Sequence, residues 1–255
     1  MSFDVAADAY DRFMGRYSTL LSPSFAAFAG IAPGMRVLDV GCGPGALTTE
    51  LVRLVRADAV AAVDPSTSFV AAARDRHPGV DVREAPAETL PFADRTFDAA
   101  LAQLVVHFMT DAVAGLREMA RVTRPGGTVA ACVWDHAGGR GPLGTFWSVA
   151  RELDDAVTDE SHLAGAREGH LAELLAAAGL GDIASTTLSA DRDHDTFEHW
   201  WEPYTQGVGP AGAYVQKLDD GHRSTLRDVL RARLGPGPFT VEARCWAARG
   251  TVAGG

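Results

Sequence analysis

The sequence predicts an α/β fold in which a mostly parallel β-sheet carries helices on both faces. Between Arg36 and Ala131, short apolar runs typical of strands alternate with segments of helical periodicity. The segments between successive strands are long enough for the right-handed crossovers that parallel strands require. The 255 residues, 47% hydrophobic and 22% charged, can bury a full core without disulfide bonds. We therefore expect a single domain over residues 1–255.

The first part of this pattern runs from Arg36 to Arg83. Pro78 marks the end of its second helix, because proline disfavours the helical conformation in the residue before it. The expected strands are Arg36–Val40, Ala59–Val63 and Val80–Arg83, separated by a helix through Leu47, Leu51 and Leu54 and a helix over Ser66–Arg76.

The alternation continues with a fourth strand at Phe97–Leu101 and a fifth at Thr128–Val133. Between them, apolar residues recur on one helical face, at Val113, Leu116, Met119 and Ala120. The run Arg124-Pro125-Gly126-Gly127 is expected to close that helix before the fifth strand, since proline and glycine interrupt helices.

After Trp134 the alternation of strand and helix patterns becomes less regular, and two segments are longer than sheet connections need. These segments, residues 135–168 and 191–237, are expected to form cap insertions at the carboxyl edge of the sheet. The remaining expected elements are helices near Phe146–Leu153, over His170–Ala178 and through Leu226, Val229 and Leu230, and strands at Ile183–Leu188 and Phe239–Ala247.

The net charge and the lack of long apolar runs argue against nucleic-acid and membrane partners. A net charge of −10, from 23 Lys and Arg against 33 Asp and Glu, disfavours binding to a phosphate backbone, so no nucleic-acid partner is expected. Nowhere do about 18 apolar residues run together, and the first residues lack the pattern of a signal peptide. We therefore expect a cytoplasmic protein without a membrane partner, with its three widely spaced cysteines reduced.

The sharpest motif is Val37-Leu38-Asp39-Val40-Gly41-Cys42-Gly43-Pro44-Gly45-Ala46, a strand that ends in a glycine turn and opens a helix. Glycines permit positive φ and close approach of a ligand, so such a loop cradles a nucleotide-like molecule. The residues Gly41, Gly43 and Ala46 also satisfy the dinucleotide pattern G-x-G-x-x-G/A.

Two carboxylates discriminate between the ligands that such a loop can bind. Asp39 would repel the pyrophosphate of a dinucleotide but favour a cationic ligand, and S-adenosylmethionine carries an ammonium and a sulfonium without a phosphate. Asp64 ends the second strand, where a carboxylate can accept hydrogen bonds from both ribose hydroxyls. The pair therefore favours an adenosyl cofactor and argues against a nicotinamide oxidoreductase.

With these residues the chain resembles the class I S-adenosylmethionine-dependent methyltransferases, in particular those that act on small molecules. The resemblance covers about Tyr10 to Leu188. It implies a Rossmann-like sheet of seven strands whose last strand is antiparallel, with S-adenosylmethionine as cofactor and S-adenosylhomocysteine as product. The segments that carry it are VLDVGCGPG at 37–45, AVDPS at 62–66, AETLPF at 87–92 and LREMARVTRPGG at 116–127.

The resemblance also implies roles in binding the cofactor. Gly41, Cys42 and Gly43 would line the methionine part, Asp39 would lie near its amino group, Asp64 would hold the ribose, Pro65 and Ser66 would border the adenine, Ala87 and Glu88 would lie at the adenine edge, and Gln103 would lie beneath the methionine. Arg16 could pair with the methionine carboxylate or be a surface arginine. Pro86 stands where the family commonly has an aspartate, so backbone groups near Ala87 would hold the adenine.

Methyl transfer depends mainly on alignment, with a base where the acceptor must lose a proton. His107 follows the fourth strand and could be that base, although the family often has a packing histidine there. Asp135 and His136 follow the fifth strand and are either catalytic or a solvated loop pair. His194 and His199 match no metal-ligand spacing, and no metal is expected.

Aromatic residues in the insertions could wall an apolar cavity for the acceptor, or could be the core of the cap. Residues 1–30 are expected to form a helical lid, since the segment AYDRFMGRYS folds over the cofactor in related enzymes. The candidates for contact with the acceptor are Tyr10, Tyr17, Trp134, Trp147, Trp200, Trp201 and Tyr204.

The sequence thus predicts an O- or N-methyltransferase that acts on a small molecule, such as a natural-product tailoring enzyme, as a monomer or homodimer. A fold does not fix a function, so a second hypothesis remains open. In it the protein binds the cofactor but catalyses another reaction, for instance a cyclisation, or serves as a binding module.

Overall fold

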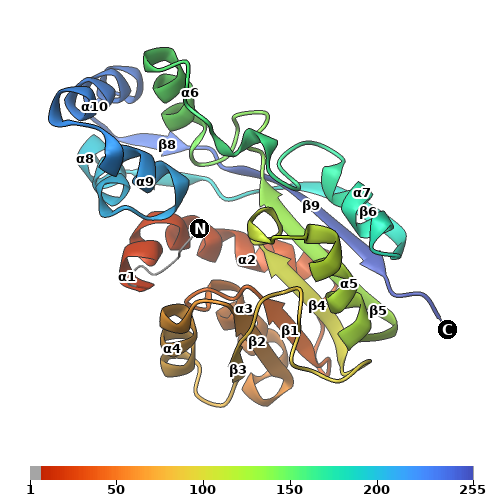
Figure 1. Cartoon of the computed structure of the whole chain (residues 1–255). Helices are drawn as coiled ribbons and strands as arrows, with labels where there is room; N and C mark the ends of the chain where they lie inside the picture. Colours follow the sequence, from red (N-terminus) through yellow and green to blue (C-terminus); the bar gives the residue numbers. More distant parts are fainter. Residues whose placement is uncertain (1–6, 255) are drawn as a thin grey trace.

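The structure is a computed structural model that describes residues 7–254 (Figure 1). Residues 1–6, which the expected lid includes, lie outside the described residues. The chain builds a seven-stranded sheet in the order β3-β2-β1-β4-β5-β9-β6. Its strands are β1 (Val37–Val40), β2 (Val60–Asp64), β3 (Asp81–Glu84), β4 (Phe97–Gln103), β5 (Thr123–Trp134), β6 (Gly181–Ser189) and β9 (Arg244–Thr251).

The sheet confirms the predicted fold class. Strands β3, β2, β1, β4 and β5 are parallel neighbours, whereas β9 runs antiparallel between β5 and β6. Every residue of β1 and β2 is buried, because helices cover both faces of the sheet. This burial explains why these strands read as apolar runs interrupted only by Asp39 and Asp64.

Helices pack on the two faces of the sheet and above its carboxyl edge (Figure 1). One face carries α2 (Arg16–Phe28), α3 (Ala46–Val55) and α4 (Thr67–Arg76), and the opposite face carries α5 (Ala112–Val122) and α7 (His170–Ala177). The other helices are α1 (Ala7–Tyr10), η1 (Asp11–Gly15), η2 (Ala57–Ala59), η3 (Val106–Phe108), α6 (Gly144–Leu153), η4 (Glu160–His162), α8 (Phe197–Trp201), η5 (Glu202–Gln206), α9 (Gly209–Lys217) and α10 (Asp220–Leu234).

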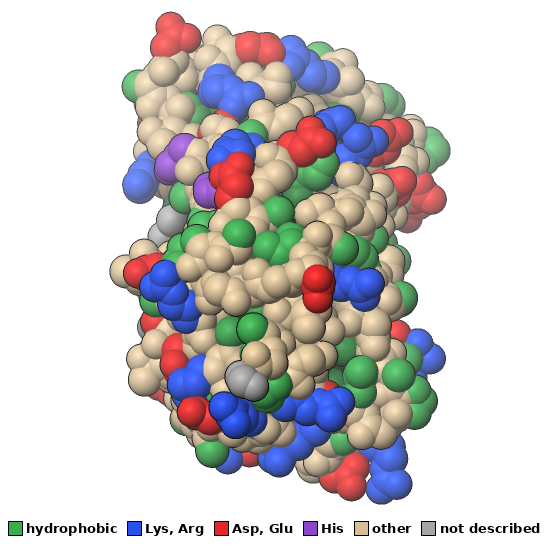
Figure 2. All heavy atoms as spheres, turned by 90° about the vertical axis from the view of Figure 1, so that its right-hand side faces the viewer, with side chains coloured by type: hydrophobic (Ala, Val, Ile, Leu, Met, Phe, Trp, Pro, Cys, Tyr) green, Lys and Arg blue, Asp and Glu red, His purple; other side chains and the backbone are tan. Residues whose placement is uncertain are grey.

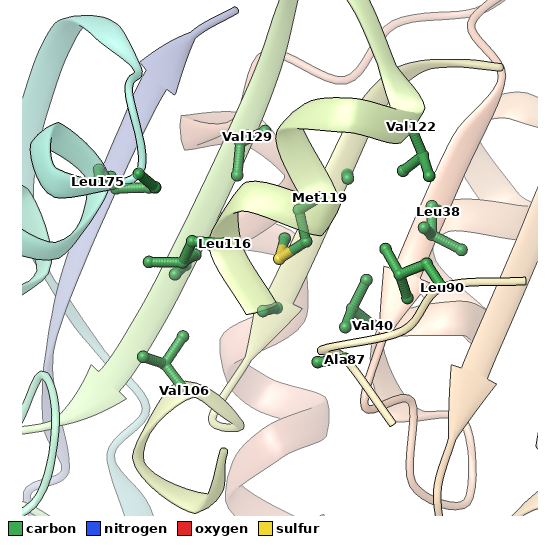
Figure 3. Close-up of a cluster of buried hydrophobic side chains, with 14 of the residues drawn as sticks. Leu38, Val40, Ala87, Leu90, Val106, Leu116, Met119, Val122, Val129 and Leu175 are labelled. Atoms are coloured by element: carbon green, nitrogen blue, oxygen red, sulfur yellow. The ribbon is translucent and has the colours of Figure 1, made fainter. Parts of the chain in front are cut away.

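Helix α5 anchors one face of the core (Figure 3). Its apolar side presents Leu116, Met119 and Val122, each fully buried, toward the sheet residues Leu38 and Val40. This is the helical face that the sequence periodicity predicts. Full burial of such side chains stabilises the fold by about 1.5–3 kcal/mol each.

Arg121, on α5, fixes the loop between β3 and β4. Its guanidinium donates to the carbonyls of Leu90 (3.1 Å) and Phe92 (2.9 Å). It also forms ion pairs with Asp94 and Glu118. The loop therefore keeps Leu90 in the core, close to the expected adenine edge of the cofactor site.

A cap stands above the carboxyl edge of the sheet, made of α6, α8, η5, α9 and α10 together with a small sheet of β7 (Arg192–His194) and β8 (Phe239–Val241) (Figure 1). Its hydrophobic core contains Phe146, Trp200 and Tyr204. Phe13, from η1, belongs to the same core and lies edge-on to the Tyr204 ring at 4.9 Å between centroids. The N-terminal helices and both insertions are therefore packed together.

Two expected boundaries were wrong. The expected strand Phe239–Ala247 is split, because β8 pairs with β7 in the cap whereas β9 belongs to the main sheet and continues to Thr251. Between them, Ala243 donates its N–H to Asp191 and accepts from the N–H of Ala190. Helix α5 ends at Val122, before the run Arg124-Pro125-Gly126-Gly127, as expected, but β5 begins at Thr123 and not at Thr128. The run therefore lies inside β5, where Gly126 has a φ of +77°.

Basic and acidic side chains are mixed over the face of the molecule shown in Figure 2, with hydrophobic groups scattered between them. This face therefore offers no continuous basic strip of the kind that tracks a phosphate backbone. None of the helices within residues 7–254 combines the length and hydropathy that crossing a bilayer requires.

The Arg121 network generates a stability prediction. Arg121→Ala should lower the free energy of unfolding by about 1–3 kcal/mol, because two carbonyls lose a charged donor. Urea denaturation measures the change. Arg117→Ala is the matched control on the same helix, since Arg117 makes one hydrogen bond to the carbonyl of Ala177 and its loss should cost less. Equal losses in the two variants would contradict the assigned role of Arg121.

Candidate active site

The glycine loop between β1 and α3 adopts backbone angles that favour glycine. Gly41, Gly43 and Gly45 have φ values of +70°, +53° and +103°. The N–H groups of Gly41 and Cys42 donate to the carbonyl of Val63, which ties the loop to β2. A Cβ atom on Gly41 would lie 2.4 Å from Val105, whereas one on Gly43 would meet no atom within 4 Å. A ligand can therefore approach the backbone closely at Gly43.

Asp64, at the end of β2, holds the loop in place. Its Oδ2 accepts from the N–H of Gly43 (2.8 Å) and its Oδ1 from the N–H of Ser66 (2.9 Å). Burial raises the pKa of Asp64, while these two N–H groups oppose the rise. Each carboxylate oxygen has a further lone pair, which leaves room for the hydroxyls of a ribose.

Asp39, in the middle of β1, is a buried carboxyl with a single hydrogen-bonding side chain. It is 1% exposed, and its Oδ2 accepts from the hydroxyl of Thr48 (2.6 Å). Burial raises its pKa to about 7, and the negative charge of Asp64 adds to the rise. No ion pair of Asp39 is present among residues 7–254. A cationic ligand group beside Asp39 would therefore stabilise its charged form.

Gln103, at the end of β4, presents an unsatisfied acceptor. Its side-chain nitrogen donates to the carbonyl of Ser18 and the hydroxyl of Ser22, both at 3.1 Å, which joins β4 to α2. Its Oε1 is buried and has no hydrogen-bond partner in the described chain. A buried carboxyl at Asp39, a free acceptor at Gln103 and open backbone at Gly43 fit S-adenosylmethionine, whose methionine part brings donors and positive charge.

The expected adenine-side residues have identifiable structural roles. The Ser66 side chain accepts from the N–H of Phe69 and caps α4, directly after Pro65. Glu88 accepts from the N–H groups of Thr110 and Asp111 at the start of α5, and Ala87 beside it is buried. These contacts fix the backbone at the predicted adenine edge, and contact with adenine stays a prediction.

Arg16 is directed toward the cap by its hydrogen bonds. Its guanidinium donates to the carbonyls of His199 (3.2 Å) and Trp200 (3.5 Å), in α8. It also lies 5.3 Å from the centre of the Tyr17 ring. Arg16 therefore joins α2 to the cap and is not a free surface arginine. Its pairing with the methionine carboxylate stays a prediction.

A largely apolar pocket opens where the sheet edge, the N-terminal helices and both insertions meet. Tyr10, the last residue of α1, forms part of its wall, as do Leu104 and His107, which follow β4. Trp134, the last residue of β5, and His136 just after it form another part. Val208 and Pro210 close it from the cap, and Glu160 lines it from the first insertion. Leu104 has a φ of +62°, a strained angle for this residue type of the kind found at functional sites.

Most of the aromatic candidates lie away from this pocket. Tyr10 and Trp134 line it, but the Tyr17 hydroxyl pairs with Nε2 of His194 (3.0 Å), and Trp147 donates its indole N–H to Glu160 (2.9 Å). Trp200, Trp201 and Tyr204 belong to the hydrophobic core of the cap. An insertion of this size needs large side chains to stabilise it, and these aromatic residues fill that need.

Asp135 does not face the pocket. It is 1% exposed, forms an ion pair with Arg140 (2.6 Å), and accepts from the N–H groups of Gly138 (2.9 Å) and the Trp246 indole (3.1 Å). The expectation of a catalytic or solvated Asp135 is therefore corrected to a structural one: its carboxylate holds the loop after β5.

His107, His136 and Glu160 form a cluster on one wall of the pocket, with ligand atoms all within 4.8 Å of one another. Burial lowers the pKa of His107 well below its usual range and that of His136 to about 4, so both imidazoles are neutral near pH 7. Burial also raises the pKa of Glu160 to about 7. Sequence reasoning missed Glu160, which lies in a polar stretch without periodicity or motif.

Comparisons with known proteins indicate the same family as the sequence motifs. A family model described as a methyltransferase domain matches residues 38–131. An uncharacterised protein of Mycobacterium tuberculosis is 31% identical over 192 residues, which cover 74% of this chain and 70% of that protein. A demethylmenaquinone methyltransferase of a Mycobacterium species is 42% identical over 106 residues, 42% of this chain and 44% of that protein.

The fold is also similar to that of solved structures. An S-adenosylmethionine-dependent methyltransferase of Thermotoga maritima aligns with a TM-score of 0.57 and 20% identity. The alignment covers 96% of this chain and 95% of that one, so the likeness extends over the cap as well as the sheet.

Asp39 generates a prediction on the pH dependence of stability. Its folded pKa of about 7 lies above the usual 3.8, so the free energy of unfolding should fall as pH rises from about 4 to 7. Asp39→Asn removes this dependence while keeping an acceptor for Thr48. The variant should gain roughly 4 kcal/mol on the wild type between pH 4 and pH 8.

Thermal or urea unfolding at a series of pH values measures this difference. Asp58→Asn is the control, because Asp58 is largely exposed and the stability of its variant should run parallel to that of the wild type. Parallel curves for Asp39→Asn would contradict the prediction.

Proposed function

The chain belongs to the class I S-adenosylmethionine-dependent methyltransferases, and from this premise we propose that it methylates a small-molecule acceptor held beneath the cap. The observation that carries the proposal is the position of the apolar pocket. Its floor is made by the segments that follow β4 and β5, next to Gln103 and the end of the sheet that presents Asp39 and the glycine loop. An acceptor there would lie beside the cofactor.

The residues that would hold the cofactor are Asp39 and Gln103 at its amino group, Gly41 to Gly43 along its methionine part, and Asp64 at its ribose. When bound, S-adenosylmethionine supplies a methyl group on an activated sulfonium. The carboxyl of Asp39 would pair with the ammonium, and Asp64 would orient the ribose while it keeps the loop closed. Contacts at the ammonium end and at the ribose end would together fix the orientation of the flexible cofactor.

We propose an acceptor with an apolar body and one nucleophilic oxygen or nitrogen. The pocket has a volume of about 40 Å³ in this structure, so it would have to widen to admit such a molecule. Tyr10, Phe108 and Trp134 supply apolar surface, and the pocket lies beneath Val208 of the cap. His107 and His136 are neutral imidazoles on its wall, and because burial disfavours their protonation, either could accept a hydrogen bond from an acceptor hydroxyl without taking its proton. The chain would thus provide alignment, exclusion of water and a hydrogen-bond acceptor.

The proposal is tested by label transfer. Purified protein is incubated with methyl-labelled S-adenosylmethionine and a panel of phenols, amines and carboxylic acids, and the products are analysed for label. We expect transfer to aromatic or apolar acceptors of one nucleophile class. Binding of the cofactor without transfer to any acceptor would instead favour the second hypothesis, a cyclase or a binding module.

Trp134 provides a variant for the same assay. Trp134→Ala removes apolar wall from the pocket and should lower kcat/KM for an accepted substrate by at least about tenfold, which corresponds to about 1.4 kcal/mol of binding. Leu20→Ala, at an exposed position on α2, is the control. An unchanged kcat/KM for Trp134→Ala would place the acceptor elsewhere.

Gly43 and Gly34 form a matched pair for the cofactor site. Both have positive φ, and a Cβ atom on either meets no atom within 4 Å, so valine strains both loops alike. Gly43→Val should abolish binding of S-adenosylmethionine, because its side chain enters the space beside the loop, whereas Gly34→Val should bind normally. Titration calorimetry measures both, and normal binding by Gly43→Val would make the loop purely structural.

A further inference from the structure

Three potential metal ligands from distant parts of the sequence meet on the wall of the pocket. His107 lies in η3 after β4, His136 follows β5, and Glu160 begins η4 in the first insertion. Within residues 7–254 they are the one group of three or more such residues close enough to share an ion. His107 and Glu160 are 6% and 4% exposed.

The imidazoles present buried nitrogen atoms without partners. Neither Nδ1 of His107 nor Nε2 of His136 has a hydrogen bond in the described chain, although both are buried. The two rings lie 5.5 Å apart between centroids, and no hydrogen bond links either one to Glu160. Buried nitrogens left unpaired are costly, so the arrangement is suited to a ligand that takes both lone pairs.

Glu160 is oriented by a contact behind it. The indole N–H of Trp147 donates to Oε2 of Glu160 (2.9 Å), and no arginine, lysine or histidine within the described residues forms an ion pair with this carboxyl. Such an outer hydrogen bond is typical of carboxylates that bind metals, because it fixes the direction of the remaining lone pairs. Trp147 is therefore a positioning residue for Glu160.

We propose that His107, His136 and Glu160 bind a divalent transition-metal ion of the zinc class at the edge of the acceptor pocket. Two imidazoles and one carboxylate suit Zn²⁺, Fe²⁺ or Co²⁺, whereas Mg²⁺ prefers a shell of oxygens. Ligand atoms around a tetrahedral ion lie about 3.4 Å apart, given bonds of about 2.0–2.1 Å. The atoms here lie within 4.8 Å of one another, so binding of an ion would draw them together by up to about 1.4 Å.

Three protein ligands leave at least one coordination position open, as in catalytic zinc sites. Tyr10 and Trp134 line the same pocket as the three ligands, so an acceptor oxygen held there could occupy this position. The ion would lower the pKa of a bound hydroxyl, which would then release its proton to water near neutral pH. This last step rests on the proposed function, while the metal site itself does not.

Cobalt provides the test, since Co²⁺ replaces Zn²⁺ and absorbs visible light when it is bound to nitrogen and oxygen ligands. The purified full chain is treated with a chelator, dialysed and titrated with Co²⁺ in the absence of cofactor and acceptor. We expect one Co²⁺ per chain, with visible absorption that disappears when Zn²⁺ is added. No bound Co²⁺ in folded protein would overturn the proposal and leave a metal-free cluster.

Variants identify the ligands. His136→Gln and Glu160→Gln should each weaken Co²⁺ binding by at least about tenfold. His162→Gln, an exposed histidine in the same short helix as Glu160, is the matched control and should bind normally. Titration of each variant with S-adenosylhomocysteine confirms that its fold is intact. Undiminished binding by the double variant of His136 and Glu160 would assign the ion to other residues and overturn the proposal.

The result is independent of methyl transfer. If Co²⁺ binds as expected but no acceptor is labelled, the metal site stands and the proposed function fails. If label transfer survives complete removal of metal with an unchanged rate, the role of the ion in deprotonating the acceptor is refuted.

Discussion

The two oxygens of Asp64 hold together the edge of the sheet on which the site is built. One accepts from the N–H of Gly43 in the loop after β1, and the other from the N–H of Ser66 at the start of α4. Asp64, at the end of β2, thereby holds the conformation of the glycine loop that follows the neighbouring strand β1. Asp39 lies below the same loop without a cation beside it. The sheet edge thus holds two buried carboxyls, and a positive ligand group beside Asp39 would stabilise the charged form of that carboxyl.

The cap is joined to this edge through the N-terminal helices. It has a hydrophobic core of its own, to which the N-terminal helices contribute Phe13. Arg16 fastens α2 to α8 through two backbone carbonyls, and Gln103 fastens α2 to β4. Helix α2 is therefore the element that connects the cap to the sheet, and the pocket lies where these three parts meet.

The sequence predicted the sheet well because its central strands β1, β2 and β4 are buried on both faces and its helices have one apolar face. The glycine loop was predictable for a similar reason, since its chemistry is local in the chain. The split of the expected last strand was not, because Ala243 turns through contacts with residues about fifty positions earlier. Trp200 and its neighbours were ambiguous, since aromatic side chains suit a cap core and a ligand cavity equally. Glu160 had no sequence signal at all, because its partners His107, His136 and Trp147 come from three other segments.

The contact between Phe13 and Tyr204 also restricts how the N-terminal helices and the cap can move relative to each other. The N-terminal helices lie over the end of the sheet that carries the glycine loop, and the cap covers the acceptor pocket. Phe13 joins the N-terminal helices to the cap, so separating these two parts would expose apolar surface and cost several kcal/mol. A movement of the N-terminal helices and the cap as one body would keep this contact. Under the proposed function, one movement of both parts would open the cofactor site and the pocket together, so the two ligands would exchange in the same open state.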